Sequence, residues 1–242
     1  MRITRVHIDQ VLTGRSEIQL PPTAAHHLLR VLRLRQGARL ALFDGHGLEY
    51  PAEILSLERG DCRVRLEPPQ QPAVESPLDT TLIQAISKGD RMDWCIQKAT
   101  ELGVSRIQPV FSERCDVRLD ARRADKRLAH WQQVAIAAAE QSGRVRVPPL
   151  HPSLALAEIS APAGLGLYLD PAATATAASL AGTNARHFSI VVGPEGGLSG
   201  TEVDRLRRLG FRGLRLGPRV LRTETAGPAV LATLQTLAGD WQ

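Results

Sequence analysis

Strand-like and helix-like hydrophobic patterns alternate along the chain after residue 78. Apolar runs predict strands at residues 80–86, 106–110, 165–170, 188–192 and 214–216, and helical periods cover residues 90–102, 121–141, 201–209 and about 225–237. Gly103 and Gly210 close two of these helices, and Ser199 with Glu202 forms an S-x-x-E capping box before the helix at 201. The alternation predicts an α/β domain with a mostly parallel sheet covered by helices.

The first part of the chain has a different pattern. Residues 62–67 (CRVRLE) alternate with period two, residues 38–43 form a second short strand, and residues 44–47 (DGHG) have turn chemistry. Residues 26–37 (HHLLRVLRLRQG) place Leu28, Leu29 and Leu32 on one helical face. The proline-rich segment 67–78 (EPPQQPAVESPL) is typical of an extended linker. We therefore predict a small β domain over residues 1–72 and the α/β domain over residues 73–242.

The composition of the 242 residues is that of a globular protein. With 43% hydrophobic and 23% charged residues, it excludes wholesale disorder, a collagen-like repeat and a coiled coil. No apolar run approaches the roughly 18 to 20 residues of a membrane span, and residues 1–19 lack the apolar stretch of a signal peptide. We therefore expect a cytoplasmic protein with no membrane contact.

The cysteines and charges refine this expectation. Cys62, Cys95 and Cys115 are widely spaced, which predicts buried free thiols and no metal site. The net charge is +5, and residues 1–40 hold seven arginines against two acids. The preference for arginine over lysine suits phosphate recognition, although a GC-rich genome would give the same bias. The basic first part favours a nucleic-acid partner.

Two loops combine glycine, proline and charged residues directly after predicted strands. Residues 193–199 (GPEGGLS) follow the apolar run SIVV, and residues 216–226 (LGPRVLRTETA) lead into the last helix. Ligands of open α/β sheets bind beyond the carboxyl ends of strands, and glycines allow the backbone to approach a ligand closely. Either loop alone could be an ordinary turn with a helix cap, so it is the pair that predicts a ligand site.

Common nucleotide and hydrolase motifs are absent from the sequence. It has no G-x-x-x-x-G-K-[ST] motif, its G-x-G at residues 164–166 precedes a strand, and it has no G-x-S-x-G motif. A P-loop NTPase, a Rossmann cofactor site and acyl-transfer hydrolysis therefore lose their support.

Residues 88–104 (KGDRMDWCIQKATELGV) begin where a strand gives way to a helix. Lys88, Asp90 and Arg91 could either cap this helix or contact a substrate. As large apolar or thiol side chains beside the stripe of Met92 and Ile96, Met92, Trp94 and Cys95 are expected in the core and not in a site.

Six segments in fixed order carry a family resemblance: residues 26–37, residues 88–104, SERC (112–115), AAEQSGR (138–144), residues 193–199 and residues 216–226. Together they closely resemble the bacterial small-subunit ribosomal RNA uracil-N3 methyltransferase family of the SPOUT superfamily. The resemblance implies a PUA-like N-terminal β-barrel and a C-terminal SPOUT domain with a deep trefoil knot. It also implies S-adenosylmethionine as methyl donor, 16S ribosomal RNA of the small subunit as substrate, and a homodimer.

The resemblance also implies a set of site residues. The knot would comprise residues 193–197 and 216–225, with the cofactor between these loops and the end of the strand at 165–170. The implied cofactor-binding residues are Leu169, Gly193, Pro194, Glu195, Gly196, Gly197, Leu216, Gly217, Leu221, Arg222, Thr223 and Thr225. Pro228 departs from a regular helix, so we expect the last helix to begin at about Ala226 or Gly227.

For the chemistry, Arg222 is the candidate that stabilises negative charge on the uracil carbonyls, and Glu195 and Glu224 are the candidate bases. The predicted RNA contacts are Arg2, Arg5, Arg30, Arg33, Arg35, Lys88, Arg91 and Arg114. A solvated basic face with no RNA contact is the alternative for these residues. The last helix and the helix at 90–102 are candidates for the dimer interface.

Two alternative functions stay open at this point. A non-catalytic RNA-binding or ribosome assembly factor could retain the same fold, although the intact glycines of residues 193–199 argue against it. A SPOUT enzyme acting on transfer RNA or on ribose 2′-hydroxyls is the second alternative. The N-terminal domain and the sequence of residues 216–226 favour the uracil-N3 family over this alternative.

Overall fold

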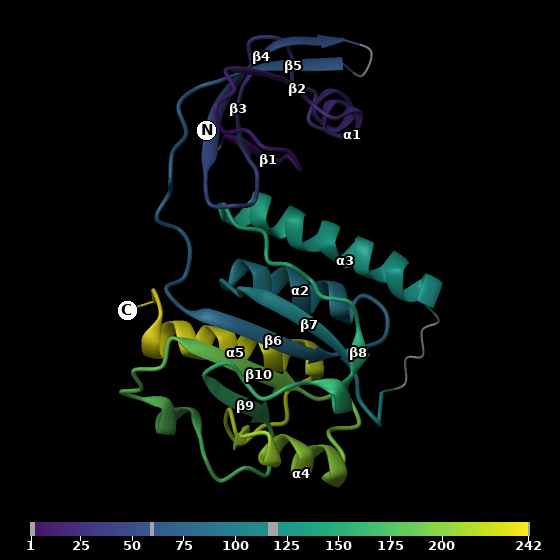
Figure 1. Cartoon of the computed structure of the whole chain (residues 1–242), viewed down its shortest axis with the longest axis vertical. Coiled ribbons are helices and arrows are strands. Elements are labelled where there is room, and N and C mark those ends of the chain that lie inside the picture. Colours follow the sequence, from purple (N-terminus) through teal and green to yellow (C-terminus); the bar gives the residue numbers. More distant parts are fainter. Residues whose placement is uncertain (1–2, 59–60, 116–120, 242) are drawn as a thin grey trace. The chain divides into compact units, whose positions relative to one another are not determined.

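A computed structural model describes residues 3–58, 61–115 and 121–241 of the chain. They form two compact units, each with its own sheet (Figure 1). The first unit comprises Met1–Glu75 and Ala139–Val147, and the second comprises Ser76–Ala138 and Pro148–Gln242. The predicted boundary at residue 72 lies close to the first division. The sequence pattern did not indicate that residues 139–147 belong to the first unit.

The first unit is built on a five-stranded sheet in the order β1-β3-β4-β5-β2. Its strands are β1 (Thr4–His7), β2 (Glu17–Gln19), β3 (Arg39–Phe43), β4 (Glu49–Glu58) and β5 (Asp61–Leu66). Strands β1 and β3 are parallel, and the other pairs are antiparallel. Cys62, Val64 and Leu66 are buried, whereas the alternate residues of β5 are exposed. The predicted period-two pattern is therefore confirmed.

The predicted helix over residues 26–37 is shorter and less regular in the structure. It consists of α1 (Pro22–His26) and a π-helical turn, η1 (His27–Val31). Leu28 is fully buried, but Leu32 is exposed. Arg33 has φ +53°, in the left-handed region that interrupts a right-handed helix. This reversal ends the helical segment and leaves Arg30, Arg33 and Arg35 exposed.

Arg5 holds the end of α3 (Ala121–Ser142) within the first unit. Its Nε donates to the Glu49 carboxylate at 2.6 Å, and its Nη atoms donate to the carbonyls of Ala139 and Arg144, both at 2.9 Å. Its guanidinium also lies over the Phe43 ring, 4.7 Å from the centroid. Only 11% of the Arg5 side chain is exposed. The predicted RNA contact of Arg5 is therefore corrected, because its donors cap the carbonyl end of a helix instead.

The second unit is an α/β layer structure whose six-stranded sheet has the order β11-β9-β10-β6-β7-β8. Its strands are β6 (Asp79–Ala85), β7 (Arg106–Phe111), β8 (Leu154–Ala155), β9 (Leu165–Leu169), β10 (His187–Val192) and β11 (Arg212–Leu214). Every paired strand runs parallel to its neighbour. The helices are α2 (Arg91–Glu101), α3, α4 (Gly200–Arg208) and α5 (Thr223–Ala238), with 3₁₀ turns at Leu156–Glu158 and Ala177–Leu180. The predicted α/β class is confirmed.

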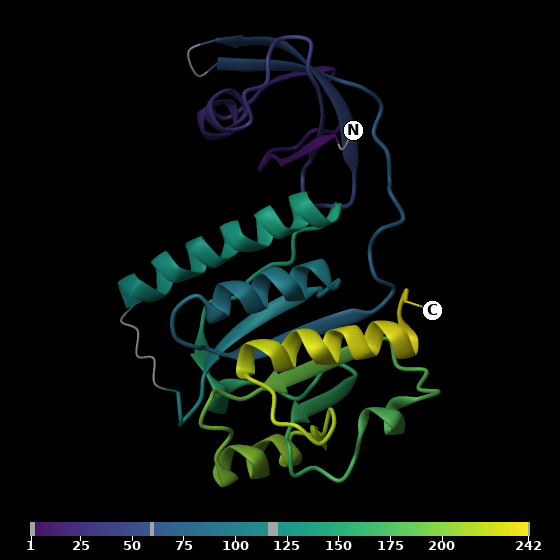
Figure 2. The ribbon, with the colours of Figure 1, turned by 180° about the vertical axis from the view of Figure 1, so that it is seen from behind.

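Alternate residues of β6 show how helices cover both faces of this sheet. Ile83 and Ala85 pack in one core cluster with Leu206 of α4. Gln84 points to the opposite face, where its side chain bonds to α5 and α2. Helices α2 and α5 lie side by side on that face (Figure 2). Within the described parts of the chain, no helix has both the length and the apolar character needed to cross a bilayer.

Two local predictions are wrong. Helix α5 begins at Thr223, so Pro228 lies in the second turn, where it cannot donate a hydrogen bond to the carbonyl of residue 224. The helix continues because Gly227 and Pro228 are buried in its packing. Trp94 was expected in the core but is 42% exposed, whereas Met92 and Cys95 are buried. The helical period places position 94 on the outer face of α2.

Candidate active site

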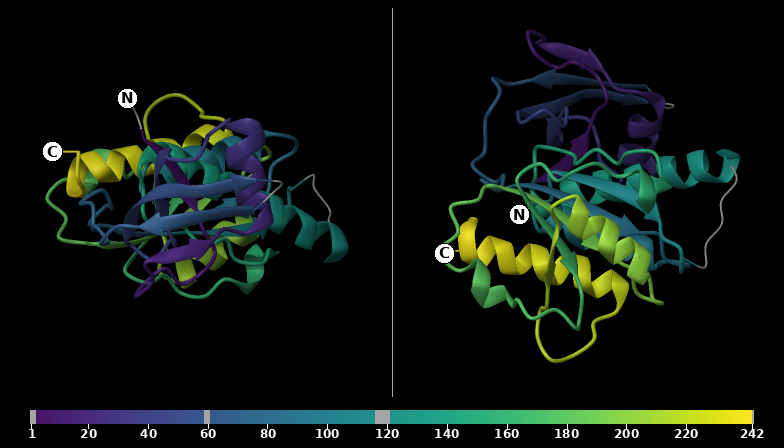
Figure 3. Two further views of the ribbon diagram at one scale, coloured as in Figure 1. Left: turned by 90° about the horizontal axis from the view of Figure 1, so that it is seen from above. Right: turned by 60° about the horizontal axis from the view of Figure 1, so that its bottom comes forward.

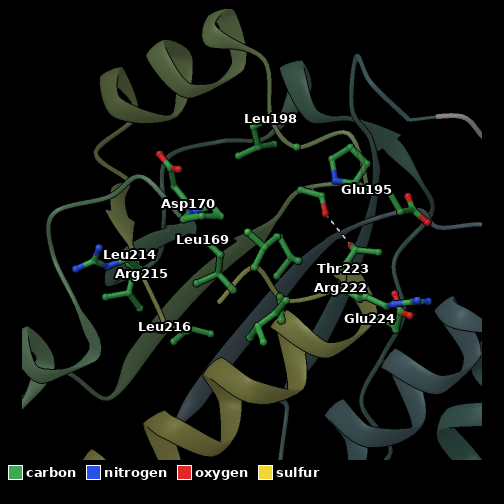
Figure 4. Close-up of a pocket in the computed structure, with 18 of the residues that line it drawn as sticks. Leu169, Asp170, Glu195, Leu198, Leu214, Arg215, Leu216, Arg222, Thr223 and Glu224 are labelled. Atoms are coloured by element: carbon green, nitrogen blue, oxygen red, sulfur yellow. Dashed lines mark hydrogen bonds between the residues drawn. The ribbon is translucent and has the colours of Figure 1, made fainter. Parts of the chain in front are cut away.

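A cavity of about 540 Å³ opens at the carboxyl ends of β9, β10 and β11 (Figure 4). Its walls come from residues 169–171, residues 192–195, 197 and 198, and residues 214–217 and 219–224, with further contributions from Arg91, Val203 and Ala226. The loop from β11 to α5, drawn in yellow-green, extends outward from the sheet (Figure 3). The two loops predicted from the sequence therefore meet at one cavity. Its volume lies in the range of about 300 to 1,000 Å³ that is typical of sites for small ligands.

Most of the predicted cofactor residues line this cavity. They are Leu169, Gly193, Pro194, Glu195, Gly197, Leu216, Gly217, Leu221, Arg222 and Thr223. Gly196 and Thr225 do not line it. A Cβ atom at Gly196 would approach Cβ of Arg114 to 3.2 Å, so Gly196 serves packing against that side chain.

Several lining residues were missed from the sequence. Asp170, Leu198, Arg215, Arg219 and Val220 also line the cavity. Asp170 follows β9 directly, so the rule that ligands bind at strand ends could have found it. Its carboxylate accepts a hydrogen bond from the amide of Ala172 at 2.8 Å, which fixes the turn after the strand. Leu198, Arg219 and Val220 lie within the two predicted loops but were not named individually, and Arg215 directly precedes the second loop.

The two candidate bases lie in different surroundings beside Arg91. Arg91 Nη1 is 2.6 Å from Glu195 Oε1, and its Nε is 3.9 Å from Glu224 Oε1. The Glu195 side chain is 37% exposed and the Glu224 side chain 14%. Oε2 of Glu224 is buried and has no hydrogen-bond partner in the described part of the structure. A buried carboxylate oxygen without a donor is costly, which marks Glu224 as a candidate functional group in the wall of the cavity.

Two of the predicted RNA contacts of the second unit, Arg91 and Arg114, also lie at this site. Arg91 belongs to the cavity wall, and the neighbouring Asp90 makes no side-chain capping bond to α2. Arg114 Nη1 donates to the carbonyl of Gly196 at 3.1 Å, so it braces the cavity loop. Lys88 is exposed. Arg2 lies outside the described residues.

Glu202 of α4 connects two loops through its buried carboxylate. The predicted capping box is confirmed, because Glu202 Oε2 accepts from the Ser199 amide at 2.8 Å and Ser199 Oγ accepts from the Glu202 amide at 3.1 Å. The same carboxylate accepts from the Ser112 hydroxyl at 3.1 Å and from the Glu113 amide at 2.8 Å. This explains the SERC segment: it is fastened to the start of α4 and hence to the loop that lines the cavity.

Replacing Glu202 by alanine is expected to destabilise the protein by about 3 kcal/mol, because the buried amide of Ser199 and the partly buried amide of Glu113 lose a charged acceptor. The melting temperature should then fall by about 6 to 12 °C, measured by thermal unfolding. Glu158→Ala is the matched control, since the exposed Glu158 carboxylate accepts from the amide of Ala155 in a short 3₁₀ turn. Equal shifts for the two variants would contradict the bracing role of Glu202.

The cysteines are free thiols, as predicted. Burial raises the pKa of Cys95 to about 12 and that of Cys62 to about 11. Both thiols therefore stay protonated near neutral pH and are poor nucleophiles. Cys115 is only half-buried, in contrast to the prediction, and its Sγ lies 2.8 Å from the carbonyl oxygen of Ile86.

Comparison with known proteins shows the family to which the chain belongs. The model of an RNA methyltransferase domain matches residues 74–235, and that of an RNA methyltransferase PUA domain matches residues 20–67. Ribosomal RNA small subunit methyltransferase E of Buchnera aphidicola subsp. Schizaphis graminum is 32% identical to the chain, over 99% of this chain and 98% of that protein. The chain belongs to the ribosomal RNA small subunit methyltransferase E family. It is an RNA methyltransferase.

Solved structures of similar proteins share the fold of this methyltransferase over nearly its whole length. A ribosomal RNA small subunit methyltransferase E from Neisseria gonorrhoeae, bound to S-adenosyl methionine, is 39% identical with a TM-score of 0.91, covering 100% of both chains. A Legionella pneumophila protein solved with the bound cofactor SAM is 36% identical with a TM-score of 0.92, covering 99% of this chain and 100% of that chain. The fold class inferred from the sequence is thus confirmed at the level of the family.

Proposed function

We propose that this methyltransferase transfers the methyl group of S-adenosylmethionine to N3 of a uridine in 16S ribosomal RNA of the small subunit. The observation that carries the proposal is the cavity at the ends of β9, β10 and β11, formed by the two glycine-rich loops. Membership of the ribosomal RNA small subunit methyltransferase E family supports the same substrate.

The lining of the cavity fits S-adenosylmethionine. Leu169, Leu216 and Leu221 provide apolar surface for an adenine ring, and the backbone of the glycine-rich loops provides polar groups for its edge. Acidic and basic side chains line the same cavity, and the cofactor has both cationic groups and a carboxylate. When bound, S-adenosylmethionine supplies a methyl group on a sulfonium, which is already strongly electrophilic.

The protein must therefore mainly present uracil N3 and remove its proton. This imide proton lies on the Watson-Crick edge, so the uridine must be unpaired when it enters the site. We assign proton removal to Glu224, because its buried Oε2 has no partner among the described residues, whereas Glu195 is closely paired with Arg91. Negative charge then spreads to the uracil O2 and O4 atoms, where the Arg222 guanidinium stabilises it.

The first unit would bind RNA through Arg30, Arg33 and Arg35, which are exposed around η1. Arg33→Gln is expected to make the plot of log affinity against log salt shallower by about 0.7 to 0.9, the value for one phosphate contact. Arg63→Gln in the same unit is the matched control, because Arg63 is exposed but paired with Glu17 at 2.9 Å. Unchanged slopes for both variants would mean that Arg33 lies on a solvated face. Filter-binding titrations with 16S ribosomal RNA fragments measure this slope.

The protein would act as a homodimer in the cytoplasm, where the small subunit is assembled. Helices α2 and α5 are the candidates for the interface, and the exposed Trp94 lies on α2. Size-exclusion chromatography with light scattering at low protein concentration tests the dimer, and a monomeric mass would contradict it.

The trefoil knot is also a proposal for this chain. Strand β11 pairs with β9 at the edge of the sheet, and the chain then returns past β9 to α5, which packs against β10 and β6. This return supports a crossing of the loops at residues 193–197 and 216–225. A crystal structure that traces both loops tests the crossing.

The decisive experiment incubates the protein and methyl-labelled S-adenosylmethionine with unmodified small subunits, naked 16S ribosomal RNA and transfer RNA. We expect label on N3 of one uracil in small-subunit RNA, mapped by nuclease digestion and mass spectrometry. Comparison of the first two substrates shows whether assembly precedes methylation. Label confined to transfer RNA, or no label despite cofactor binding, would overturn the substrate. No cofactor binding would favour an RNA-binding factor without turnover.

A further inference from the structure

A chain of buried polar groups runs from the core of the second unit to the cavity loop. Gln84 of β6 is fully buried, and its Nε2 donates to Thr223 Oγ1 at 2.9 Å. Thr223 Oγ1 in turn donates to the carbonyl of Gly193 at 2.7 Å (Figure 4). At the other end, the thiol of Cys95 donates to Gln84 Oε1 at 3.4 Å. Helix α2, strand β6 and helix α5 are thereby linked to the loop after β10.

The core is shaped around the amide of Gln84. The Gln84 side chain is shut off from solvent, so its amide nitrogen and oxygen require hydrogen-bond partners within the protein. Its Nε2 also donates to the Ala85 carbonyl at 3.2 Å. Gly227 of α5 faces the amide, and a Cβ atom there would approach Gln84 Oε1 to 3.1 Å and Cys95 Sγ to 3.4 Å. The small residue leaves the space that the amide occupies.

The direction of each hydrogen bond follows from the groups involved. An amide nitrogen can only donate, so the Thr223 hydroxyl must accept from Gln84 and point its single proton at Gly193. A thiol proton from Cys95 requires an acceptor, which places the oxygen of the Gln84 amide toward α2. The burial that raises the pKa of Cys95 to about 12 keeps that proton in place. Bonds in such a chain polarise and strengthen one another.

The peptide unit between Gly193 and Pro194 has few other means of being fixed. Pro194 has no amide proton, so the carbonyl of Gly193 is the one polar group of this peptide unit. Gly193 has no side chain, and a Cβ atom there would approach Leu198 Cγ to 3.1 Å. Both residues line the cavity. The hydrogen bond from the Thr223 hydroxyl therefore fixes the loop at the residue where it follows β10.

We propose that Gln84 is a positioning residue for cofactor binding: it orients the Thr223 hydroxyl, which holds the Gly193–Pro194 peptide in its cavity-lining conformation. The inference rests on the proposed function, since it assigns S-adenosylmethionine to this cavity. It also changes the role of Thr223, which was predicted to contact the cofactor. Thr223 acts through the loop, and sequence reasoning gave no sign of Gln84 because a glutamine in a strand has no motif around it.

The test compares Thr223→Val with Thr223→Ser in calorimetric titrations with S-adenosylmethionine alone. Valine keeps the shape of threonine but leaves the Gly193 carbonyl and the Gln84 amide without partners, so the dissociation constant should rise about tenfold. Serine keeps the hydroxyl and should stay within about threefold of the natural protein. The matched control is Thr100→Val, at a fully buried threonine of α2 whose hydroxyl donates to the Ile96 carbonyl at 2.8 Å. It should lower the melting temperature without changing the dissociation constant.

Gln84→Leu tests the first link of the chain. It should raise the dissociation constant by about three- to tenfold alone and add almost nothing to Thr223→Val, because both substitutions break one chain. The proposal is overturned if Thr223→Val binds like the natural protein, if serine is as weak as valine, or if the two substitutions add fully. If Gln84→Leu does not fold, the comparison of Thr223→Val with Thr223→Ser still tests whether the hydroxyl holds the loop for cofactor binding. Absence of binding to the natural protein would instead contradict the proposed function.

Discussion

Replacing Glu224 by glutamine is expected to lower kcat by about 100- to 10,000-fold, the contribution typical of a general base. Glutamine has the same shape as glutamate but cannot take up the N3 proton. Glu224 is suited to the task because Oε2 is buried beside the cavity without a donor from the described residues, while Oε1 lies 3.9 Å from Arg91 Nε. Single-turnover methyl transfer at saturating S-adenosylmethionine measures the loss, and calorimetry should show cofactor affinity changed by less than about threefold.

Glu195→Gln is the matched control for this experiment. Its carboxylate is more exposed and lies 2.6 Å from Arg91 Nη1, so its loss should reduce kcat by about tenfold or less. RNA with 5-fluorouridine at the target site provides a second readout, since fluorine makes the N3 proton more acidic. This substrate should restore part of the rate of Glu224→Gln, and raising the pH should do the same. A larger loss for Glu195→Gln than for Glu224→Gln would transfer the role to Glu195.

The hydrophobic pattern predicted helices and strands well where the burial of each residue depends only on which face of its element it occupies. Strand β5 alternates strictly because one face of its sheet is buried, and β10 is buried without interruption over residues 188–192 because helices cover both faces of the second sheet. The pattern failed where a contact with a distant part of the chain determines the start of a helix or the burial of a side chain. Helix α5 starts before Pro228 because packing of Gly227 and Pro228 compensates a missing hydrogen bond. Arg5 reads as a surface cation, yet it caps the end of a helix 134 residues further along the chain.

The sequence predicted the two loops that line the site, but not the residues that hold these loops in place. Glycine, proline and charge at strand ends indicated residues 193–199 and 216–226, and the strand-end rule extends this to Asp170. The supporting residues have no such signal. Glu202 was predicted as a helix cap, but its bonds to Ser112 and Glu113 depend on how two distant loops approach each other. Gln84 and Thr223 meet across 139 residues, and nothing local marks either as a partner.

Arg222→Ala is expected to reduce kcat by about 100- to 1,000-fold, as for the loss of one group that stabilises developing negative charge. The backbone of Arg222 is held firmly, because its carbonyl accepts from the amides of Thr225 and Ala226, both at 2.9 Å. Its side chain thus leaves a fixed point at the start of α5 and lines the cavity. An arginine cannot act as the base, so its part must be electrostatic.

Two further variants distinguish stabilisation of the transition state by Arg222 from a general electrostatic attraction between its charge and the RNA. Arg222→Lys keeps the charge but not the planar fork of donors, so it should recover part of the rate lost in Arg222→Ala. Arg219→Ala removes an equal charge from the same loop and should lower RNA affinity more than kcat. Full turnover of Arg222→Ala at saturating cofactor would refute charge stabilisation. A raised dissociation constant for S-adenosylmethionine with unchanged kcat would instead assign the guanidinium to the carboxylate of the cofactor, because only a contact that strengthens in the transition state lowers kcat when it is lost.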